Sequence, residues 1–312
     1  MITFTRRDVL GQLTLGVSMS LASPGAESAS KPKPMLRRPI PASAGRESVP
    51  VIGMGTWNTF DVGSSQAERA PLKEVLDSFY QAGASLIDSS PMYGRAEGVT
   101  GELVEAASAR DRTFLATKVW TSGADKGTAQ IENSFRLLRT KQLDLLQIHN
   151  LLDWRTHLPT LRSLKEAGRV RYIGITHYTV SAHADLQAAL RAEPFDFVQF
   201  NYSIATRAAE QTLLPFCQEH GIAVLINRPF EEGALFTKVG NRKLPGYARE
   251  IDCSSWSQLF LKYIVSHPAV TCVIPATSRT NHMRDNIKGG SGRMPDEKLR
   301  QRMVKDFEQS GA

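Results

Sequence analysis

The sequence predicts an α/β fold, a single-domain (β/α)8 TIM barrel, from three observations. From Val51 onward, short apolar runs rich in β-branched residues alternate with longer amphipathic stretches. Eight such runs are present, which is the strand number of this barrel, and about 250 residues is its usual length. An open doubly wound sheet is the alternative, but no GxGxxG motif follows the first strand, where that fold would carry one.

The apolar runs predict strands at 49–57, 86–90, 113–119, 143–150, 171–178, 195–202, 223–230 and 270–278. Helical patterns lie between them at 70–83, 129–139, 158–168 and 209–221, and three of the four end in glycine, as helix C-termini often do. The longest stretch with neither pattern is 231–253. The polar tail after Ile287 is expected to add one more helix.

Residues 1–28 read as an export signal of the twin-arginine type. Arg6 and Arg7 precede a moderately apolar run at 9–22, which is too short and too rich in Gly, Ser and Thr to span a bilayer. An amphipathic N-terminal helix is the alternative. Residues 29–48 hold four prolines and predict a linker leading into a short hairpin, so that the barrel domain covers 49–312.

The signal makes the twin-arginine export machinery an expected partner. It places the mature protein in the periplasm or outside the cell, and a chain whose signal is not used would stay in the cytoplasm. The twin-arginine route resembles the one taken by proteins that fold around a cofactor before export. The mature protein is expected to be a monomer without a stable membrane span.

Composition narrows the class of ligand. The chain has 38 basic and 31 acidic residues, a net charge of +7. The basic residues are scattered, and none of their clusters is interleaved with aromatic residues as in a single-strand nucleic-acid binder. An anionic cofactor or substrate is therefore favoured over nucleic acid. The three cysteines are widely spaced without a CxxC pair, so neither a disulfide framework nor a metal site is predicted.

Polar residues end the predicted strands, and in this barrel the strand ends form the active-site face. Four ionisable residues follow three adjacent strands: Asp88, Tyr93, Lys118 and His149. The other strands end with Trp57, Thr176, His177, Gln199, Asn201, Asn227, Arg228, Thr277, Ser278 and Arg279. Each residue alone could be an ordinary surface group, but their convergence on one rim predicts a catalytic site.

The four ionisable groups suit the interconversion of a carbonyl and an alcohol. A phenol with a pKa of about 10 is a weak acid at neutral pH. An ammonium about 4 Å away would favour the phenolate by up to roughly 4 kcal/mol, about three pKa units. Lys118 is therefore expected to bring the pKa of Tyr93 close to neutral, while Asp88 orients Lys118 and neutral His149 donates to the carbonyl. The hydride must come from a cofactor.

Six segments, in order, carry a resemblance to a family. They are "IGMGTW" (52–57), "LIDSSPMYG" (86–94), "FLATKVW" (114–120), "LDLLQIHN" (143–150), "GRVRYIGIT" (168–176) and "VIPATSRTNHMRDN" (273–286). From about Val51 to Ile287 the chain resembles the aldo-keto reductase superfamily. The resemblance implies a catalytic tetrad of Asp88, Tyr93, Lys118 and His149. It also implies that NADP(H), rather than NAD(H), lies across the strand ends.

The resemblance assigns cofactor contacts position by position. Gln199 would bind the nicotinamide carboxamide, Asn286 the adenine, and Arg279 the 2′-phosphate. The remaining expected cofactor contacts are Thr176, His177, Asn227, Arg228, Phe230, Thr277 and Ser278.

Several residues depart from the family pattern. Thr176 and His177 stand where serine and asparagine are frequent, and Asn227 replaces the aromatic residue that stacks on the nicotinamide. Ala276 and His282 replace a lysine and an arginine that commonly hold the 2′-phosphate. Glu231 and Glu232 are two further departures: they are acidic residues at positions where the negatively charged pyrophosphate of the cofactor would pass.

Three tryptophans, Trp57, Trp120 and Trp154, each follow a strand and are expected to line the substrate pocket, with packing on the barrel rim as the alternative.

The leading hypothesis is an exported NADP(H)-dependent oxidoreductase acting on a small carbonyl or alcohol substrate. The alternative is a cofactor-bound, non-catalytic binding or regulatory subunit of the same fold, in the manner of family members that attach to membrane channels. The unusual 227–236 loop and the export signal motivate that alternative.

Overall fold

The computed structural model describes residues 33–309, so the predicted signal segment lies outside the described residues. Eight parallel strands form one sheet in chain order, and parallel bridges between Ile52 and Val273 and between Gly55 and Ala276 join its first and last strands. The predicted (β/α)8 barrel is therefore confirmed. Its strands are β3 (Met54–Gly55), β4 (Leu86–Asp88), β5 (Phe114–Val119), β6 (Leu143–Ile148), β7 (Val170–Thr176), β8 (Phe197–Asn201), β9 (Ala223–Asn227) and β10 (Cys272–Val273).

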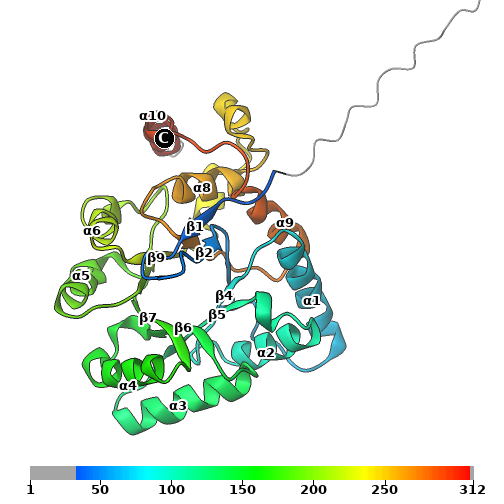
Figure 1. Ribbon diagram of the computed structural model, residues 1–312. Coiled ribbons are helices and arrows are strands. Elements are labelled where there is room, and N and C mark those ends of the chain that lie inside the picture. The colour runs from blue at the N-terminus through cyan, green and yellow to red at the C-terminus, as the bar shows by residue number, and fades with distance from the viewer. Residues whose placement is uncertain (1–32, 310–312) are drawn as a thin grey trace, which may run out of the picture. The chain divides into compact units, whose positions relative to one another are not determined.

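The first predicted strand, 49–57, is wrong in its extent. Its beginning belongs to β2 (Ser48–Pro50), which pairs antiparallel with β1 (Arg37–Pro39) in a hairpin. The second half of the predicted 29–48 linker is thus structured. Ile40 and Val49 of this hairpin are buried against side chains inside the barrel, so the hairpin closes the amino end of the barrel (Figure 1).

Helices surround the strands (Figure 1). They are α1 (Gln66–Gln81), α2 (Ala96–Ala106), α3 (Ala124–Leu137), α4 (Trp154–Glu166), α5 (His183–Ala192), α6 (Leu213–His220), α7 (Ala234–Val239), α8 (Trp256–Val265), α9 (Thr280–Lys288) and α10 (Glu297–Glu308). The four predicted helices overlap α1, α3, α4 and α6, and the expected final helix is α10. Within the stretch without a pattern, 231–253, lie α7 and two 3-10 turns.

The helices cover the apolar outer faces of the strands, and this buried layer fixes where the strand ends lie. In α1, Leu72, Val75, Leu76 and Phe79 face inward with the spacing of one helical face, as the pattern at 70–83 predicts. Among residues 33–309, no helix has the length and apolar character needed to cross a membrane.

Candidate active site

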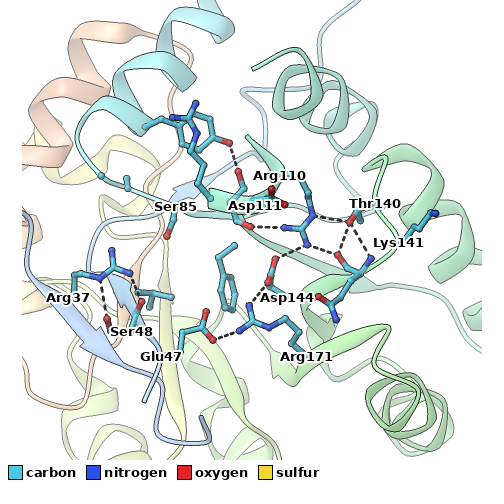
Figure 2. A pocket seen from close by; sticks show the side chains of 18 residues that line it. Arg37, Glu47, Ser48, Ser85, Arg110, Asp111, Thr140, Lys141, Asp144 and Arg171 are labelled. Atoms are coloured by element: carbon cyan, nitrogen blue, oxygen red, sulfur yellow. Dashed lines mark hydrogen bonds and ion pairs between the residues drawn. The ribbon is translucent and has the colours of Figure 1, made fainter. Parts of the chain in front are cut away.

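Cavities lie at both ends of the barrel. One, of about 760 Å³, opens at the amino ends of the strands beside the β1–β2 hairpin. Figure 2 shows that charged side chains in it pair with one another: Arg110 and Arg171 both contact Asp144, at 3.1 and 2.5 Å, and Arg171 also contacts Glu47. These pairs join the hairpin to the barrel, and none of the predicted site residues lines this cavity.

The second cavity, about 1110 Å³, opens at the carboxyl ends of the strands. It exceeds the roughly 300–1,000 Å³ of ordinary small-molecule pockets, and is thus large enough for a cofactor and a substrate together. Predicted site residues that line it are Trp57, Asp88, Tyr93, His149, Thr176, Gln199, Asn227, Arg228, Phe230, Thr277 and Asn286. The candidate active site lies here.

Lys118 lies beneath this cavity, fully buried on β5. Its Nζ is 2.5 Å from Asp88 Oδ2 and 2.7 Å from the carbonyl oxygen of Ser89. Burial, the largest single effect, opposes a charge on Lys118, but Asp88 and Tyr93 together outweigh it and raise the pKa of the lysine above its ordinary value. The lysine therefore stays an ammonium. Its Nζ lies 5.1 Å from the centre of the Tyr93 ring.

Tyr93 does not have the pKa that its neighbour was expected to give it. Burial of the phenol raises its pKa, and the Lys118 ammonium lowers it by less. The expectation that Lys118 brings this pKa close to neutral is therefore wrong for this structure. The main physical reason is the burial of the phenol, and the negative charge of Asp88, which pairs with Lys118, also acts against the phenolate.

His149 stands beside Tyr93 with the two rings nearly perpendicular and their centres 5.8 Å apart. Burial lowers the pKa of His149 to about 2, and the nearby charges of Lys118 and His177 act in the same direction. The imidazole is therefore neutral at any working pH, as the sequence predicted. A neutral imidazole can donate one hydrogen bond without carrying charge.

Two glutamines connect Asp88 to the wall of the cavity. Asp88 Oδ1 accepts from Nε2 of Gln147 at 2.9 Å and from Nε2 of Gln199 at 3.1 Å. The Oε1 atom of Gln199 in turn accepts, at 3.4 Å, from both Thr176 and Asn227. Sequence reasoning missed Gln147, although strand alternation places it on the same inward face as His149.

Asn227 carries the observation that tests the fit of a nicotinamide cofactor. Its Nδ2 donates to the carbonyl oxygen of His177 at 3.1 Å, while its Oδ1 is buried without a hydrogen-bond partner. A buried acceptor left unpaired is costly. Together with Gln199 Oε1 it presents acceptors on the cavity wall, and a carboxamide N–H complements them. The residues present therefore fit a nicotinamide.

The other end of the cavity is lined by residues at and before α9. Asn286 accepts from the Ser257 hydroxyl at 2.6 Å, and Asp285 accepts from Ser255 and Gln258, both at 2.6 Å. Ala276 and His282, the two departures from the family pattern at the 2′-phosphate, also line it. Ser278 and Arg279 are exposed and do not line the cavity, and neither does His177, whose Nδ1 accepts from the backbone of its own loop.

The acidic pair expected along a pyrophosphate is partly neutralised. Glu232 pairs with Arg228 at 3.0 Å, and Glu231 accepts from the Ser203 hydroxyl at 2.6 Å. Arg228, Glu231 and Glu232 all have positive φ angles, between 49° and 55°. Non-glycine residues in this region are strained, and such strain is often found at functional sites.

The three tryptophans are placed differently. Trp57 lines the cavity. Trp120 is 39% exposed and is not one of its lining residues, although its ring centre is 6.4 Å from that of His149. The expectation for Trp154 is wrong: it begins α4, and its ring packs against Phe195 at 6.3 Å rather than lining the cavity. The turn after β6 carries the chain outward before Trp154 is reached, so position after a strand was not sufficient.

Comparison with known proteins agrees with this geometry. The model of the Aldo/keto reductase family matches residues 51–302. The chain belongs to this family. The aldo/keto reductase is 27% identical over 250 residues to the methylglyoxal reductase YeaE of Escherichia coli, a match covering 78% of this chain and 86% of that protein. It is 26% identical over 261 residues to a 9,11-endoperoxide prostaglandin H2 reductase of Trypanosoma cruzi, covering 81% of this chain and 86% of that protein.

Solved structures of aldo-keto reductases are also similar to this chain. An aldo-keto reductase of Klebsiella pneumoniae in complex with NADPH superposes on this aldo/keto reductase with a TM-score of 0.72 and 26% identity, covering 88% of this chain and 96% of the other. A second Klebsiella pneumoniae structure, with NADP and acetate, gives a TM-score of 0.69 at 25% identity, covering 84% and 93%.

Proposed function

We propose that this aldo/keto reductase interconverts aldehydes or ketones with alcohols, using NADP(H) as the hydride carrier and Tyr93 as the proton donor. The observation that carries the proposal is the buried Lys118–Asp88 pair, which holds an ammonium 5.1 Å from the centre of the Tyr93 ring at the floor of a large cavity. A binding module has no physical need for such a costly buried charge pair.

The choice of NADP(H) rests on the fit of the cavity and on the NADPH and NADP complexes of the similar Klebsiella pneumoniae structures. Gln199 Oε1 and Asn227 Oδ1 would hold the nicotinamide carboxamide. At the other end, Thr277 and Asn286 would contact the adenosine, and Arg279 would reach the 2′-phosphate from the rim. When bound, NADPH supplies a hydride to the carbonyl carbon.

The residues of the chain handle the carbonyl oxygen. His149 and Tyr93 both line the cavity and would donate hydrogen bonds to that oxygen, orienting it and stabilising the negative charge that builds on it. A developing alkoxide is a much stronger base than a phenolate, so Tyr93 can release its proton even with a raised pKa. Lys118, fixed by Asp88, would then stabilise the phenolate that remains.

The substrate is a small aldehyde, ketone or alcohol. The mouth of the cavity is apolar on one side, where Trp57 and Met92 are 40% and 41% exposed. Methylglyoxal is the first compound to assay, because a similar protein is named as its reductase. An aromatic aldehyde that contacts the apolar side is the second.

The test is Tyr93→Phe in the purified protein, assayed by NADPH oxidation. We expect turnover to fall by about 10²–10⁴-fold, the usual contribution of a proton donor, while NADPH affinity stays within about twofold. Tyr80→Phe is the matched control, because the Tyr80 hydroxyl contacts Thr113 at 2.6 Å, away from the active-site cavity. Turnover unchanged in Tyr93→Phe would contradict the proposal. A protein that binds NADPH but reduces no carbonyl would instead support the binding-subunit alternative.

We further propose export as a folded monomer through the twin-arginine machinery, supported by Arg6 and Arg7 and the run that follows. Changing both arginines to lysine should retain the protein in the cytoplasm of its host. Cell fractionation, followed by assay for nicotinamide nucleotide released from the denatured protein, tests export and cofactor retention together.

A further inference from the structure

His149 has a partner that the proposed mechanism has not used. Its Nδ1 lies 3.0 Å from the hydroxyl oxygen of Ser90. Ser90 is completely buried and follows β4 by two residues, in the turn that leads from Asp88 to Tyr93. His149 itself is only 5% exposed. The contact therefore links the turn that carries the proton donor to the imidazole at the end of β6.

The partners of Ser90 fix the direction of this hydrogen bond. The hydroxyl oxygen accepts from the backbone N–H of Met92 at 3.2 Å, and its other contact is His149 Nδ1. The backbone nitrogen of Met92 can only donate, so the hydroxyl proton has one acceptor, His149 Nδ1. If Nδ1 carried a proton, the Ser90 proton would be buried without a partner, which is unfavourable. Nδ1 is thus the acceptor, and the single proton of the neutral ring is on Nε2.

The Nε2 atom is the one left for the substrate. It makes no hydrogen bond to any residue in the range 33–309, and His149 lines the active-site cavity. We propose that Ser90 is a positioning residue that holds His149 in the Nε2–H tautomer, so that the imidazole donates to the carbonyl oxygen of the substrate. This inference rests on the proposed function and concerns the same site.

The tautomer can be read directly in the protein with NADP⁺ bound, by ¹⁵N NMR of the histidine rings at neutral pH. The chain has 7 histidines, and the His149 signals are those that disappear in His149→Gln. We expect a neutral ring with Nε2 protonated and Nδ1 shifted by an accepted hydrogen bond. A wild-type ring protonated on Nδ1 would overturn the inference, and this measurement needs no variant of Ser90.

Variants of Ser90 test the cause. In Ser90→Ala we expect the Nδ1 signal to move toward its position without a hydrogen bond, and Ser90→Thr, which keeps the hydroxyl, to restore it. Ser89→Ala is the matched control, because the Ser89 hydroxyl accepts from Thr56 at 3.0 Å and makes no hydrogen bond to His149. It should leave the His149 signals unchanged. An Nδ1 signal that is the same in Ser90→Ala as in the wild type would overturn the inference.

Kinetics give the functional consequence. We expect kcat for carbonyl reduction to fall about five- to fiftyfold in Ser90→Ala, with the Kd for NADPH unchanged and with recovery in Ser90→Thr. A fully active Ser90→Ala would overturn the positioning role. The two proposals fail separately: a wild-type protein that reduces no carbonyl contradicts the proposed function, while the NMR measurement still reports the tautomer.

Discussion

Lys118 Nζ lies 2.5 Å from Asp88 Oδ2, and the two side chains are only 0% and 2% exposed. A charge this deeply buried persists only when a partner neutralises it and its remaining hydrogen bonds are made. Ser89 provides one of these through its carbonyl oxygen, and Gln147 and Gln199 occupy the other carboxylate oxygen. The ammonium near Tyr93 is thus fixed in place before any substrate arrives.

Removing the carboxylate should damage both stability and turnover. Asp88→Asn leaves the Lys118 ammonium buried without its counter-ion, and we expect a loss of about 3–5 kcal/mol in the free energy of unfolding. The lysine should then lose its proton, and carbonyl reduction should fall at least tenfold. Urea denaturation and steady-state assays check the two effects. Glu132→Gln is the control, because it breaks an exposed pair with Arg169 and should cost less than about 1 kcal/mol. Equal losses in the two variants would contradict the account.

The raised pKa of Tyr93 predicts opposite pH profiles for the two directions. Reduction needs the protonated phenol, which persists at every pH below its raised pKa, so the rate should be flat through neutral pH and fall only above about pH 10. Oxidation of the alcohol needs the phenolate, so the rate of oxidation should rise as the pH increases from neutral toward the raised pKa of Tyr93. Initial rates in both directions between pH 6 and 10.5 check this. A fall in reduction near pH 7 would contradict it.

The fold and the convergence of the four ionisable residues could be predicted because each depends on local pattern. Apolar runs and helical periodicity mark the strands and helices, and Asp88, Lys118 and His149 end strands whose carboxyl ends must converge. The extent of the first strand was predicted wrongly because Val49 and Pro50 of the hairpin continue the apolar pattern of the following strand. Nothing in that pattern shows where the chain leaves the barrel.

What could not be predicted depends on distances between segments far apart in the chain. The pKa of Tyr93 follows from the balance of burial against a neutralised ammonium, which no sequence pattern reports. Trp154, like Trp120, follows a strand, but the turn between β6 and Trp154 directs it away from the cavity. Ser90 reads as an ordinary turn residue until His149 is found 3.0 Å away.

Acid should destabilise the folded protein through His149. Its pKa is about 2 in the folded state, against 6.5 ordinarily, so between these values only the unfolded chain binds the proton. The contribution of His149 to stability is therefore complete above about pH 6.5 and is lost by about 1.4 kcal/mol per pH unit as the pH falls. The free energy of unfolding of His149→Gln should fall less steeply between pH 6.5 and 4.5. Parallel curves for the two proteins would contradict this prediction.

Arg279 should decide between NADPH and NADH, because Ala276 and His282 replace the basic residues that its family commonly uses. Arg279→Ala would remove the one charge-assisted hydrogen bond that we propose Arg279 makes with the 2′-phosphate, so we expect the Kd for NADPH to rise about tenfold and that for NADH to stay the same. Fluorescence titration with both nucleotides measures this. Arg284→Ala is the control, since Arg284, in the helix α9 that follows Arg279, donates to Ser78 at 3.3 Å instead. If Arg279→Ala weakens both nucleotides equally, the role is not specific to the phosphate.

Arg300 should hold α10 against the barrel. Arg300 as a whole residue is only 5% exposed. Its guanidinium donates to Glu210 and Tyr202, both at 2.8 Å, to Ser266 at 3.0 Å, and to the carbonyl oxygen of Tyr263. Arg300→Met keeps the apolar stem but leaves the Glu210 carboxylate without its cation. We expect a loss of about 3 kcal/mol and a fall in Tm of about 5–10 °C.

The position of Arg300 in α10 also predicts where the protein opens first. In Arg300→Met the amides of α10 should exchange with solvent before those of the strands, because the helix loses its buried tie while the barrel keeps its own hydrogen bonds. Arg302→Met is the control: Arg302 lies on the same helix but is 62% exposed, and its loss should cost less than about 1 kcal/mol. Hydrogen exchange followed by mass spectrometry separates the two variants. If both released α10 equally, the helix would be held by its apolar face, through Met303 and Phe307, rather than by the buried guanidinium.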